Sequence, residues 1–335
     1  MTIRVAINGF GRIGRNFARA VHANSKLELV AANDLGDIAT LAHLLKHDSV
    51  HGRAPFSVSH DDKGIAIDGT CMAMFNERDP ENLPWASLGI DVVIESTGFF
   101  TKREGAAKHL TAGAKRVIIS APSGDCDATY VMGVNDNDYD AATDTVISNA
   151  SCTTNCLAPM IKVLDDAFGV EKGLITTVHA YTGDQSIVDG PHRDLRRARA
   201  AAVNVVPTTT GAARATGLVL PDMIGKLDGM AMRVPIPNGS ITDFVGNLHA
   251  EPSTEEVNEA FRAAATTGLL ASVLDYSEEP LVSSDIVGSP ASCTFDSGLT
   301  MALGNMVKIA GWYDNEWGYS NRLVDLAELI GASSS

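Results

Sequence analysis

The chain has 335 residues, 45% hydrophobic and 20% charged, which is enough for two domains and unlike a disordered tail. Lys and Arg number 26 against 41 Asp and Glu, so the net charge is −15, and we expect neither nucleic acid nor a membrane as a partner. No run approaches the roughly 18 apolar residues of a membrane helix. The N-terminus enters a strand-like pattern at once, so no signal peptide is expected. Five cysteines without a Cys-x-x-Cys pair favour a reducing, cytoplasmic location.

The first 150 residues alternate short β-branched runs with helical stretches. This alternation predicts a parallel sheet covered by helices on both faces, which binds ligands at the carboxyl ends of its strands. The expected strands are 3–7, 27–32, 91–95, 116–120 and 145–148.

After about residue 150 the regular alternation of short strands and helices ends. A long irregular segment, 181–210, carries Gly, Pro and four arginines, and loops of this length are usually functional or disordered. A helix over 254–267 should begin with a capping box formed by Ser253 and Glu256. These features predict an α+β domain with a mainly antiparallel sheet. Its other expected elements are a helix over 152–168 and strands 174–178, 229–235 and 241–249, while the pattern leaves open on which domain a last amphipathic helix, 318–330, packs.

Residues 9–14 read G-x-G-x-x-G between the first expected strand and a helix over 12–22. Gly9 allows a tight turn, Gly11 lets the backbone approach a pyrophosphate, and Gly14 lets helix and strand pack closely. Asp34 follows 20 residues after Gly14, at the end of the second strand, where it can accept hydrogen bonds from ribose hydroxyls. A 2′-phosphate would meet this carboxylate, so the pattern predicts a Rossmann-type dinucleotide-binding domain that prefers NAD over NADP.

Cys152 is expected at the start of a helix, between Ser151 and Thr153. Helix N–H groups and the helix dipole favour a thiolate there, so Cys152 is the candidate nucleophile. His179 follows the strand 174–178 at the mouth of the long loop and is the candidate general base. Most cysteines and lone histidines are packing or surface residues, and this alternative stays open on local grounds.

Five segments in order along the chain resemble phosphorylating glyceraldehyde-3-phosphate dehydrogenases. The ten-residue segment Ala150–Pro159 resembles the active-site signature of that family. The other four segments are Ile7–Arg15, Thr177–Thr182, Leu195–Arg199 and Trp312–Tyr319.

The resemblance implies oxidative phosphorylation of glyceraldehyde 3-phosphate with NAD and inorganic phosphate. The Cys152 thiolate would attack the aldehyde, His179 would take the hydroxyl proton, and phosphate would release the resulting thioester as an acyl phosphate. Two alternatives remain: an erythrose-4-phosphate dehydrogenase, which shares the thiol and the histidine, and a catalytically idle binding protein.

The resemblance also implies binding residues. For the substrate phosphate these are mainly Thr182 and Arg233, and Arg197 is shared with the site of the attacking phosphate. For the attacking phosphate they are Ser151, Thr153, Thr210 and Gly211. For NAD they are the backbone of Arg12 and Ile13, then Arg78, Ser120 and, for the nicotinamide carboxamide, Asn315. Gly190 departs from the larger apolar residue of NAD-specific members, which leaves the strictness of the NAD preference open.

The resemblance further implies an NAD-binding domain of residues 1–150 and 318–335, a catalytic domain of residues 151–317, and a homotetramer. No metal is expected. His43, His47 and His51 recur every four residues, but Asp48 and Gly52 make a continuous helix doubtful. The arginines of 193–199 are better explained by a loop that faces phosphates than by a nucleic-acid surface.

Overall fold

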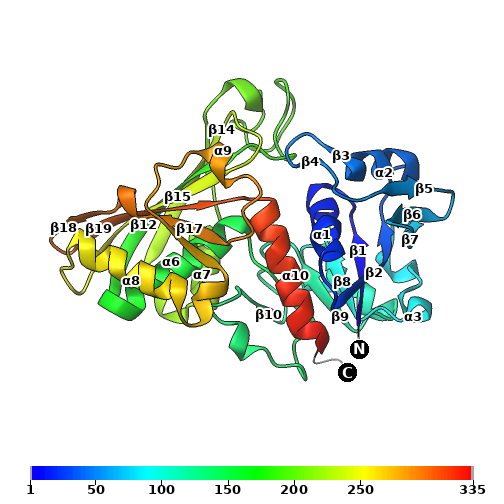
Figure 1. Ribbon diagram of the computed structural model, residues 1–335, viewed down its shortest axis with the longest axis horizontal. Coiled ribbons are helices and arrows are strands. Elements are labelled where there is room, and N and C mark those ends of the chain that lie inside the picture. Colours follow the sequence, from blue (N-terminus) through cyan, green and yellow to red (C-terminus); the bar gives the residue numbers. More distant parts are fainter. Residues whose placement is uncertain (1, 333–335) are drawn as a thin grey trace. The chain divides into compact units, whose positions relative to one another are not determined.

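The computed structural model describes residues 2–332, which form two compact units. The first unit comprises residues 2–130, 137–150 and 320–332, and the second comprises residues 131–136 and 151–319. Each unit contains its own large sheet with helices against it (Figure 1). Within residues 2–332, no helix is both long and apolar enough to span a membrane.

The sheet of the first unit has the strand order β10-β11-β9-β8-β1-β2-β7-β6-β5. Its pairings are parallel from β10 through β7, and β7, β6 and β5 pair antiparallel. The buried β-branched runs thus form the parallel sheet that their pattern predicts. The strands are β1 (Ile3–Asn8), β2 (Leu27–Asn33), β5 (Val58–His60), β6 (Gly64–Ile67), β7 (Thr70–Phe75), β8 (Val92–Glu95), β9 (Arg116–Ile119), β10 (Ala128–Thr129) and β11 (Val146–Ser148).

Helices α1 to α5 lie in the connections between the parallel strands, whereas α10 comes after the last strand of the chain. Helix α1 joins β1 to β2 and packs beside them (Figure 1). The helices are α1 (Arg12–His22), α2 (Ile38–Lys46), α3 (Trp85–Leu88), α4 (Arg103–Ala106), α5 (Lys108–Thr111) and the part of α10 (Trp317–Ala332) from Ser320 onward.

Two local features of this unit bear on the sequence predictions. The antiparallel strands β5 and β6 were not expected, because they are only three and four residues long. Helix α2 ends at Lys46, and His47 and Asp48 form β3, which pairs with β4 (Gly52–Arg53). The three histidines therefore do not lie on one continuous helix.

The sheet of the second unit is mixed. The central strand β12 (Val170–Ala180) pairs parallel with β14 and antiparallel with β15, and β16 pairs parallel with β17. The other pairings are antiparallel, so the expected mainly antiparallel sheet contains two parallel pairs. Besides β12, the strands are β13 (Val206–Thr209), β14 (Leu227–Val234), β15 (Ser240–Leu248), β16 (Leu274–Ser277), β17 (Cys293–Asp296), β18 (Met301–Leu303) and β19 (Met306–Tyr313).

Two strand predictions in this unit need correction. β12 is 11 residues long and includes His179, whereas the sequence predicted a strand over 174–178 followed by the histidine. The last part of the segment 181–210 is β13, because Val206–Thr209 pairs with β14 and is not irregular.

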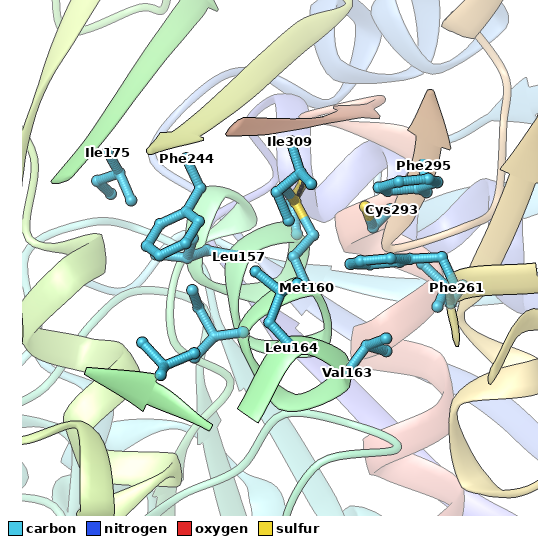
Figure 2. Packing of buried hydrophobic residues seen from close by; sticks show 14 of the residues in the cluster. Leu157, Met160, Val163, Leu164, Ile175, Phe244, Phe261, Cys293, Phe295 and Ile309 are labelled. Atoms are coloured by element: carbon cyan, nitrogen blue, oxygen red, sulfur yellow. Dashed lines mark hydrogen bonds between the residues drawn. The ribbon is translucent and has the colours of Figure 1, made fainter. Parts of the chain in front are cut away.

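Helix α6 (Cys152–Phe168) packs against this sheet and supplies the centre of the core. Leu157, Met160 and Leu164 of α6 meet Phe244 of β15 and Ile309 of β19 (Figure 2). On the other side of the core, helix α8 (Thr254–Thr266) stacks Phe261 on Phe295 with ring centroids 3.8 Å apart. The predicted capping box is present, since Glu256 N–H donates to Ser253 Oγ and Ser253 N–H donates to Glu256. The remaining helices are α7 (Ala212–Val219) and α9 (Ser283–Ile286).

All five cysteines are unpaired thiols. Cys156 and Cys293 are buried in the core of the second unit, as expected for structural cysteines. Cys71 is exposed and Cys126 is half-buried, so these two are not core residues.

Candidate functional site

The glycine-rich turn joins β1 to α1 at the carboxyl edge of the parallel sheet. Gly9 has φ +93°, and a Cβ there would lie 2.6 Å from the Thr97 nitrogen. A Cβ on Gly14 would lie 2.2 Å from the Gly9 carbonyl oxygen, so only glycine allows α1 to pack this closely on the turn. Gly11 precedes α1, and a Cβ there would meet nothing within 4 Å. The turn therefore leaves open space where a pyrophosphate would approach the start of α1.

Asp34 directly follows β2, and its carboxylate is held by backbone groups. Oδ2 accepts a hydrogen bond from Phe10 N–H at 2.7 Å and Oδ1 accepts one from Gly36 N–H at 2.8 Å. The carboxylate is thus tied to the glycine-rich turn itself. These backbone bonds use one lone pair of each oxygen and leave others for ribose hydroxyls.

The structure brings the other predicted residues of the adenine side to the same edge of the sheet. Ser120 directly follows β9, and its N–H bonds to the Glu95 carbonyl oxygen at 2.9 Å. Arg78 is exposed three residues after the end of β7. Arg12 and Ile13 are the first two residues of α1, and the Arg12 guanidinium forms two hydrogen bonds with Asp48, at 3.0 and 3.1 Å. The carboxyl edge of this sheet therefore fits a dinucleotide.

Cys152 and His179 lie together in the second unit. Ser151 caps α6 by accepting the Thr154 N–H at 3.0 Å, which places Cys152 on the first residue of that helix. The Cys152 Sγ lies 3.4 Å from the His179 Nε2, near the end of β12. This is the distance at which an imidazole can exchange a proton with a thiol.

Arg233 stands beside His179 because β12 and β14 pair in parallel register at these two residues. The Ala180 carbonyl oxygen lies 2.7 Å from His179 Nδ1 and accepts from Arg233 Nη1 at 3.0 Å, and Nη1 also contacts Nδ1. With its proton on Nδ1, the ring donates to Ala180 and presents Nε2 to the thiol as a base. With its proton on Nε2, the ring donates to the sulfur and Nδ1 accepts from Arg233.

The charge states of the pair follow from burial and from Arg233. Burial, together with the Arg233 charge, lowers the pKa of His179 to about 3, so the imidazole is neutral at physiological pH. Burial raises the pKa of the Cys152 thiol, while Arg233 and hydrogen bonds from Thr153 lower it. The upward effect of burial was not visible in the sequence, which predicted only the stabilising helix start. His179 is therefore in the right form to take the proton from Cys152.

Two of the predicted anion ligands are guanidinium groups close to this pair. The Arg233 Nε is buried and has no hydrogen-bond partner among the described residues. Arg197 Nε donates to Thr208 Oγ1 at 2.9 Å, and Nη1 forms an ion pair with Asp184. A buried N–H without a partner is costly unless a ligand satisfies it, so Arg233 fits an anion-binding role.

The remaining predicted phosphate ligands also belong to the second unit. Thr153 is turned into the protein, with its hydroxyl 2.9 Å from the Tyr313 hydroxyl. Thr182 follows β12 and forms a tight turn with Gln185. Thr210 and Gly211 directly precede α7, where Thr210 Oγ1 accepts the Ala212 N–H at 3.2 Å. The hydroxyl of Thr153 would have to rotate away from Tyr313 to reach a ligand.

Asn315 is buried in the second unit, and its Oδ1 accepts a hydrogen bond from Ser240 Oγ at 2.8 Å. This contact orients the amide of the residue predicted for the nicotinamide carboxamide.

Sequence reasoning missed several polar residues that support the predicted ones. Ser96 Oγ donates to the Gly9 carbonyl oxygen at 2.7 Å, and Asp184 and Thr208 hold Arg197. The Ser-Thr-Gly run after β8 was an available signal, because polar residues at the carboxyl end of a parallel strand commonly line a ligand site.

A parallel sheet with a glycine-rich turn at its carboxyl edge, together with a unit in which a half-buried thiol lies beside a buried imidazole and two arginines, defines the class of dinucleotide-dependent dehydrogenases. Residues 3–103 match the NAD-binding domain of glyceraldehyde 3-phosphate dehydrogenase, and residues 151–315 match its C-terminal domain. The chain belongs to the glyceraldehyde-3-phosphate dehydrogenase family.

Individual relatives are similar over their whole length. The chain is 62% identical over 333 residues to glyceraldehyde-3-phosphate dehydrogenase of Streptomyces coelicolor, covering 99% of each chain. It is 58% identical over 340 residues to that of Mycobacterium avium, covering 99% of this chain and 100% of the relative. The cofactor of the matched N-terminal domain is NAD.

Proposed function

We propose that this protein oxidises and phosphorylates glyceraldehyde 3-phosphate to 1,3-bisphosphoglycerate with NAD and inorganic phosphate. The observation that carries the proposal is the 3.4 Å contact between Cys152 Sγ and His179 Nε2 beside Arg233. A neutral imidazole next to a thiol and a guanidinium is suited to making a nucleophile for an anionic aldehyde.

The proposed reaction uses Cys152 and His179 in sequence. His179 Nε2 accepts the thiol proton as the Cys152 sulfur attacks the aldehyde carbon, and it returns this proton to the aldehyde oxygen, which completes the hemithioacetal. His179 next takes the hydroxyl proton of this adduct, and a thioester on Cys152 remains. When bound, NAD supplies the acceptor for the hydride that leaves the hemithioacetal carbon. Phosphate then attacks the thioester carbonyl and restores the free thiol.

Two anions have to be held near this thiol in a chain of net charge −15. We assign the substrate phosphate mainly to Arg233 and Thr182, with Arg197 shared between the two anions. The attacking phosphate is assigned to Ser151, Thr153, Thr210 and Gly211. Guanidinium groups and hydroxyls provide the charge-assisted hydrogen bonds that phosphate requires, and they overcome the overall repulsion locally.

NAD is assigned to the turn 9–14, Asp34, Arg78 and Ser120, with Asn315 for the carboxamide. Asp34 disfavours a 2′-phosphate by charge repulsion. We expect kcat/KM to be higher for NAD than for NADP in steady-state assays, and equal values would contradict the role of Asp34. A Cβ at Gly190 would meet only ordinary contacts within the chain, at 3.5 Å or more, so packing does not exclude alanine at this position.

The proposed domains differ from the two compact units at residues 131–136 and 318–319, which belong to the second unit. Residues 1–150 and 318–335 would form the NAD-binding domain and residues 151–317 the catalytic domain. We further propose a homotetramer in the cytoplasm. The segment 181–205 supports this assembly, because it exposes Ile187, Leu195 and Val203, which are 87%, 82% and 76% accessible.

A rapid-mixing experiment tests the mechanism. NADH formation is followed after mixing enzyme and NAD with glyceraldehyde 3-phosphate in the absence of phosphate. We expect a burst of about one equivalent per subunit that stalls until phosphate is added, because the thioester accumulates. Steady turnover without phosphate, or faster turnover with erythrose 4-phosphate, would contradict the assigned reaction.

A further inference from the structure

A row of polar side chains connects the carboxyl ends of three adjacent strands in the first unit. Asn33, Asn8 and Glu95 are the last residues of β2, β1 and β8, and they are direct neighbours in register. Asn33 Nδ2 donates to Asn8 Oδ1 at 2.8 Å, and Asn8 Nδ2 donates to Glu95 Oε2 at 2.6 Å. All three residues are buried. This row lies at the edge of the sheet that carries the glycine-rich turn.

The row ends in a buried histidine whose proton position is fixed. Trp85 Nε1–H, which can only donate, bonds to His109 Nδ1 at 2.9 Å. The neutral ring must then carry its proton on Nε2, which lies 3.0 Å from Glu95 Oε2. Hydrogen bonds from both ends of the network therefore converge on the Glu95 carboxylate. His109 and Glu95 have essentially no exposed side chain, so each of these bonds lacks competition from water.

The other oxygen of Glu95 holds the turn that follows β8. Oε1 accepts hydrogen bonds from Thr97 N–H at 2.9 Å and from Thr97 Oγ1. The neighbouring Ser96 donates through Oγ to the carbonyl oxygens of Asn8, at 3.1 Å, and of Gly9, at 2.7 Å. Because the Thr97 nitrogen is also the atom that leaves no room for a Cβ on Gly9, the two turns are packed directly on each other.

We propose that Glu95, oriented by His109 and Asn8, is a positioning residue for dinucleotide binding. Its carboxylate fixes the turn 96–98 against Gly9, and this contact sets the conformation of the glycine-rich turn before a ligand arrives. Preorganisation of this kind raises the affinity for NAD, because no binding free energy is used to order the turn. The inference rests on NAD binding by residues 9–14, and it assigns no contact with NAD to Glu95, His109 or Trp85.

The test compares two substitutions of the same histidine by their dissociation constants for NAD, measured by calorimetric titration. His109→Leu removes the donor to Glu95 and leaves the Trp85 N–H unpaired, so we expect the Kd to rise about 10-fold. His109→Gln can accept from Trp85 and donate to Glu95, so its Kd should stay within about 2-fold of the wild type. KM for NAD should rise in His109→Leu by a larger factor than kcat falls.

Tyr130→Phe is the matched control for loss of stability. It removes another buried hydrogen bond of the first unit, from the Tyr130 hydroxyl to Asp144 at 2.5 Å. It should lower Tm without weakening NAD binding. If His109→Leu weakens binding no more than Tyr130→Phe, the network is only structural and the proposal is wrong. A wild-type protein that fails to bind NAD would instead contradict the proposed cofactor.

Two milder variants keep the proposal testable if His109→Leu does not fold. Thr97→Val removes the hydroxyl that donates to Glu95 and accepts from Phe99 N–H at 3.1 Å, whereas Thr97→Ser retains both bonds. We expect a Kd for NAD several-fold higher in the first variant and close to wild type in the second. Equal values in the two variants would overturn the assignment of Glu95.

Discussion

Arg233 influences both members of the thiol–imidazole pair, and it does so with opposite consequences. Its positive charge disfavours a second positive charge on His179 and favours a negative charge on the Cys152 sulfur. The register of β12 and β14 puts this guanidinium beside the ring, so the effect is built into the sheet. Arg233 therefore keeps the imidazole neutral and at the same time counteracts the effect of burial, which raises the pKa of the Cys152 thiol.

Replacing Arg233 should make the thiol harder to ionise. In Arg233→Gln, loss of the positive charge raises the pKa of Cys152, so we expect the midpoint of its alkylation by iodoacetamide to move to higher pH. A change of about one unit corresponds to roughly 10-fold slower alkylation below the midpoint. The measurement is the alkylation rate across a pH series in the absence of NAD.

Arg262→Gln provides the control for this measurement. Arg262 is also an arginine of the second unit, but it is exposed on α8 and pairs with Glu278 at 2.6 Å. Its replacement should leave the alkylation profile unchanged. An Arg233→Gln profile that matches the wild type would show that Arg233 does not act on the thiol.

At the scale of elements, the start of α1 combines two glycines with different physical roles. Gly14 is required for packing, because a Cβ there would overlap the Gly9 carbonyl oxygen. Gly11 has space for a Cβ and an ordinary φ of −73°, so folding does not require glycine at that position. This open space is consistent with the proposed approach of a pyrophosphate to Gly11.

The two alanine variants should separate these roles. We expect Gly14→Ala to lower the melting temperature, because the turn and helix must move apart. Gly11→Ala should keep the wild-type Tm and weaken NAD binding about 10-fold or more, because the added methyl group occupies the path of the pyrophosphate. Thermal unfolding and NAD titration of both variants provide the measurements, and a Gly11→Ala variant with wild-type affinity would contradict the binding role.

Strand β11, which lies between the edge strand β10 and β9, is held by a carboxylate. Asp127 accepts hydrogen bonds from Thr145 N–H, Thr145 Oγ1 and Val146 N–H at 2.8–3.0 Å, and from Arg103 at 2.6 Å. Burial raises the pKa of Asp127, but these hydrogen bonds outweigh it and lower the pKa to about 2. The ionised form is thus stabilised by folding, and this contribution is present above pH 4 and lost as the pH falls toward 2.

Asp127→Asn should therefore reduce stability at neutral pH by about 1–2 kcal/mol. The difference in unfolding free energy between wild type and variant should shrink as the pH is lowered from 5 to 3. Denaturant unfolding at several pH values measures this difference. Asp62→Asn, at an exposed position, is the control, and a difference that does not depend on pH would contradict the role of ionised Asp127.

At the scale of the whole molecule, the exposed apolar residues of the segment 181–205 bear on assembly. A monomer would leave Ile187, Leu195 and Val203 in water, at a cost of about 1.5–3 kcal/mol for each fully exposed large side chain. Contact with further copies of the chain would remove this surface from water. A tetramer of 35.3 kDa chains would have a mass of about 141 kDa.

Light scattering coupled to size-exclusion chromatography measures this mass directly. We expect a value of about 141 kDa for the wild type and a smaller one for the double variant Ile187→Ser and Leu195→Ser. Leu303→Ser, which changes another exposed leucine outside the segment, should leave the mass unchanged if this segment carries the assembly. A monomeric wild type would rule out the tetramer.

The sequence alone determined the class of fold and the identity of the family. Buried β-branched runs predict a parallel sheet, because the strands of such a sheet are covered on both faces. The segment Ala150–Pro159 identifies the family, because it resembles the active-site signature of that family. The capping box of α8 was also predictable, because caps are local interactions between residues three positions apart.

Tertiary structure decided which side chains meet across long stretches of chain. The neighbourhood of Cys152, His179 and Arg233 depends on the register of β12 and β14, and the row from Trp85 to Asn33 depends on the order of β2, β1 and β8. The pKa of Cys152 likewise depends on burial, which no local pattern reports. The periodicity of apolar residues in the sequence indicates which faces of a segment are buried. Contacts between residues far apart in the sequence are set by how the strands pair and how the sheets and helices pack.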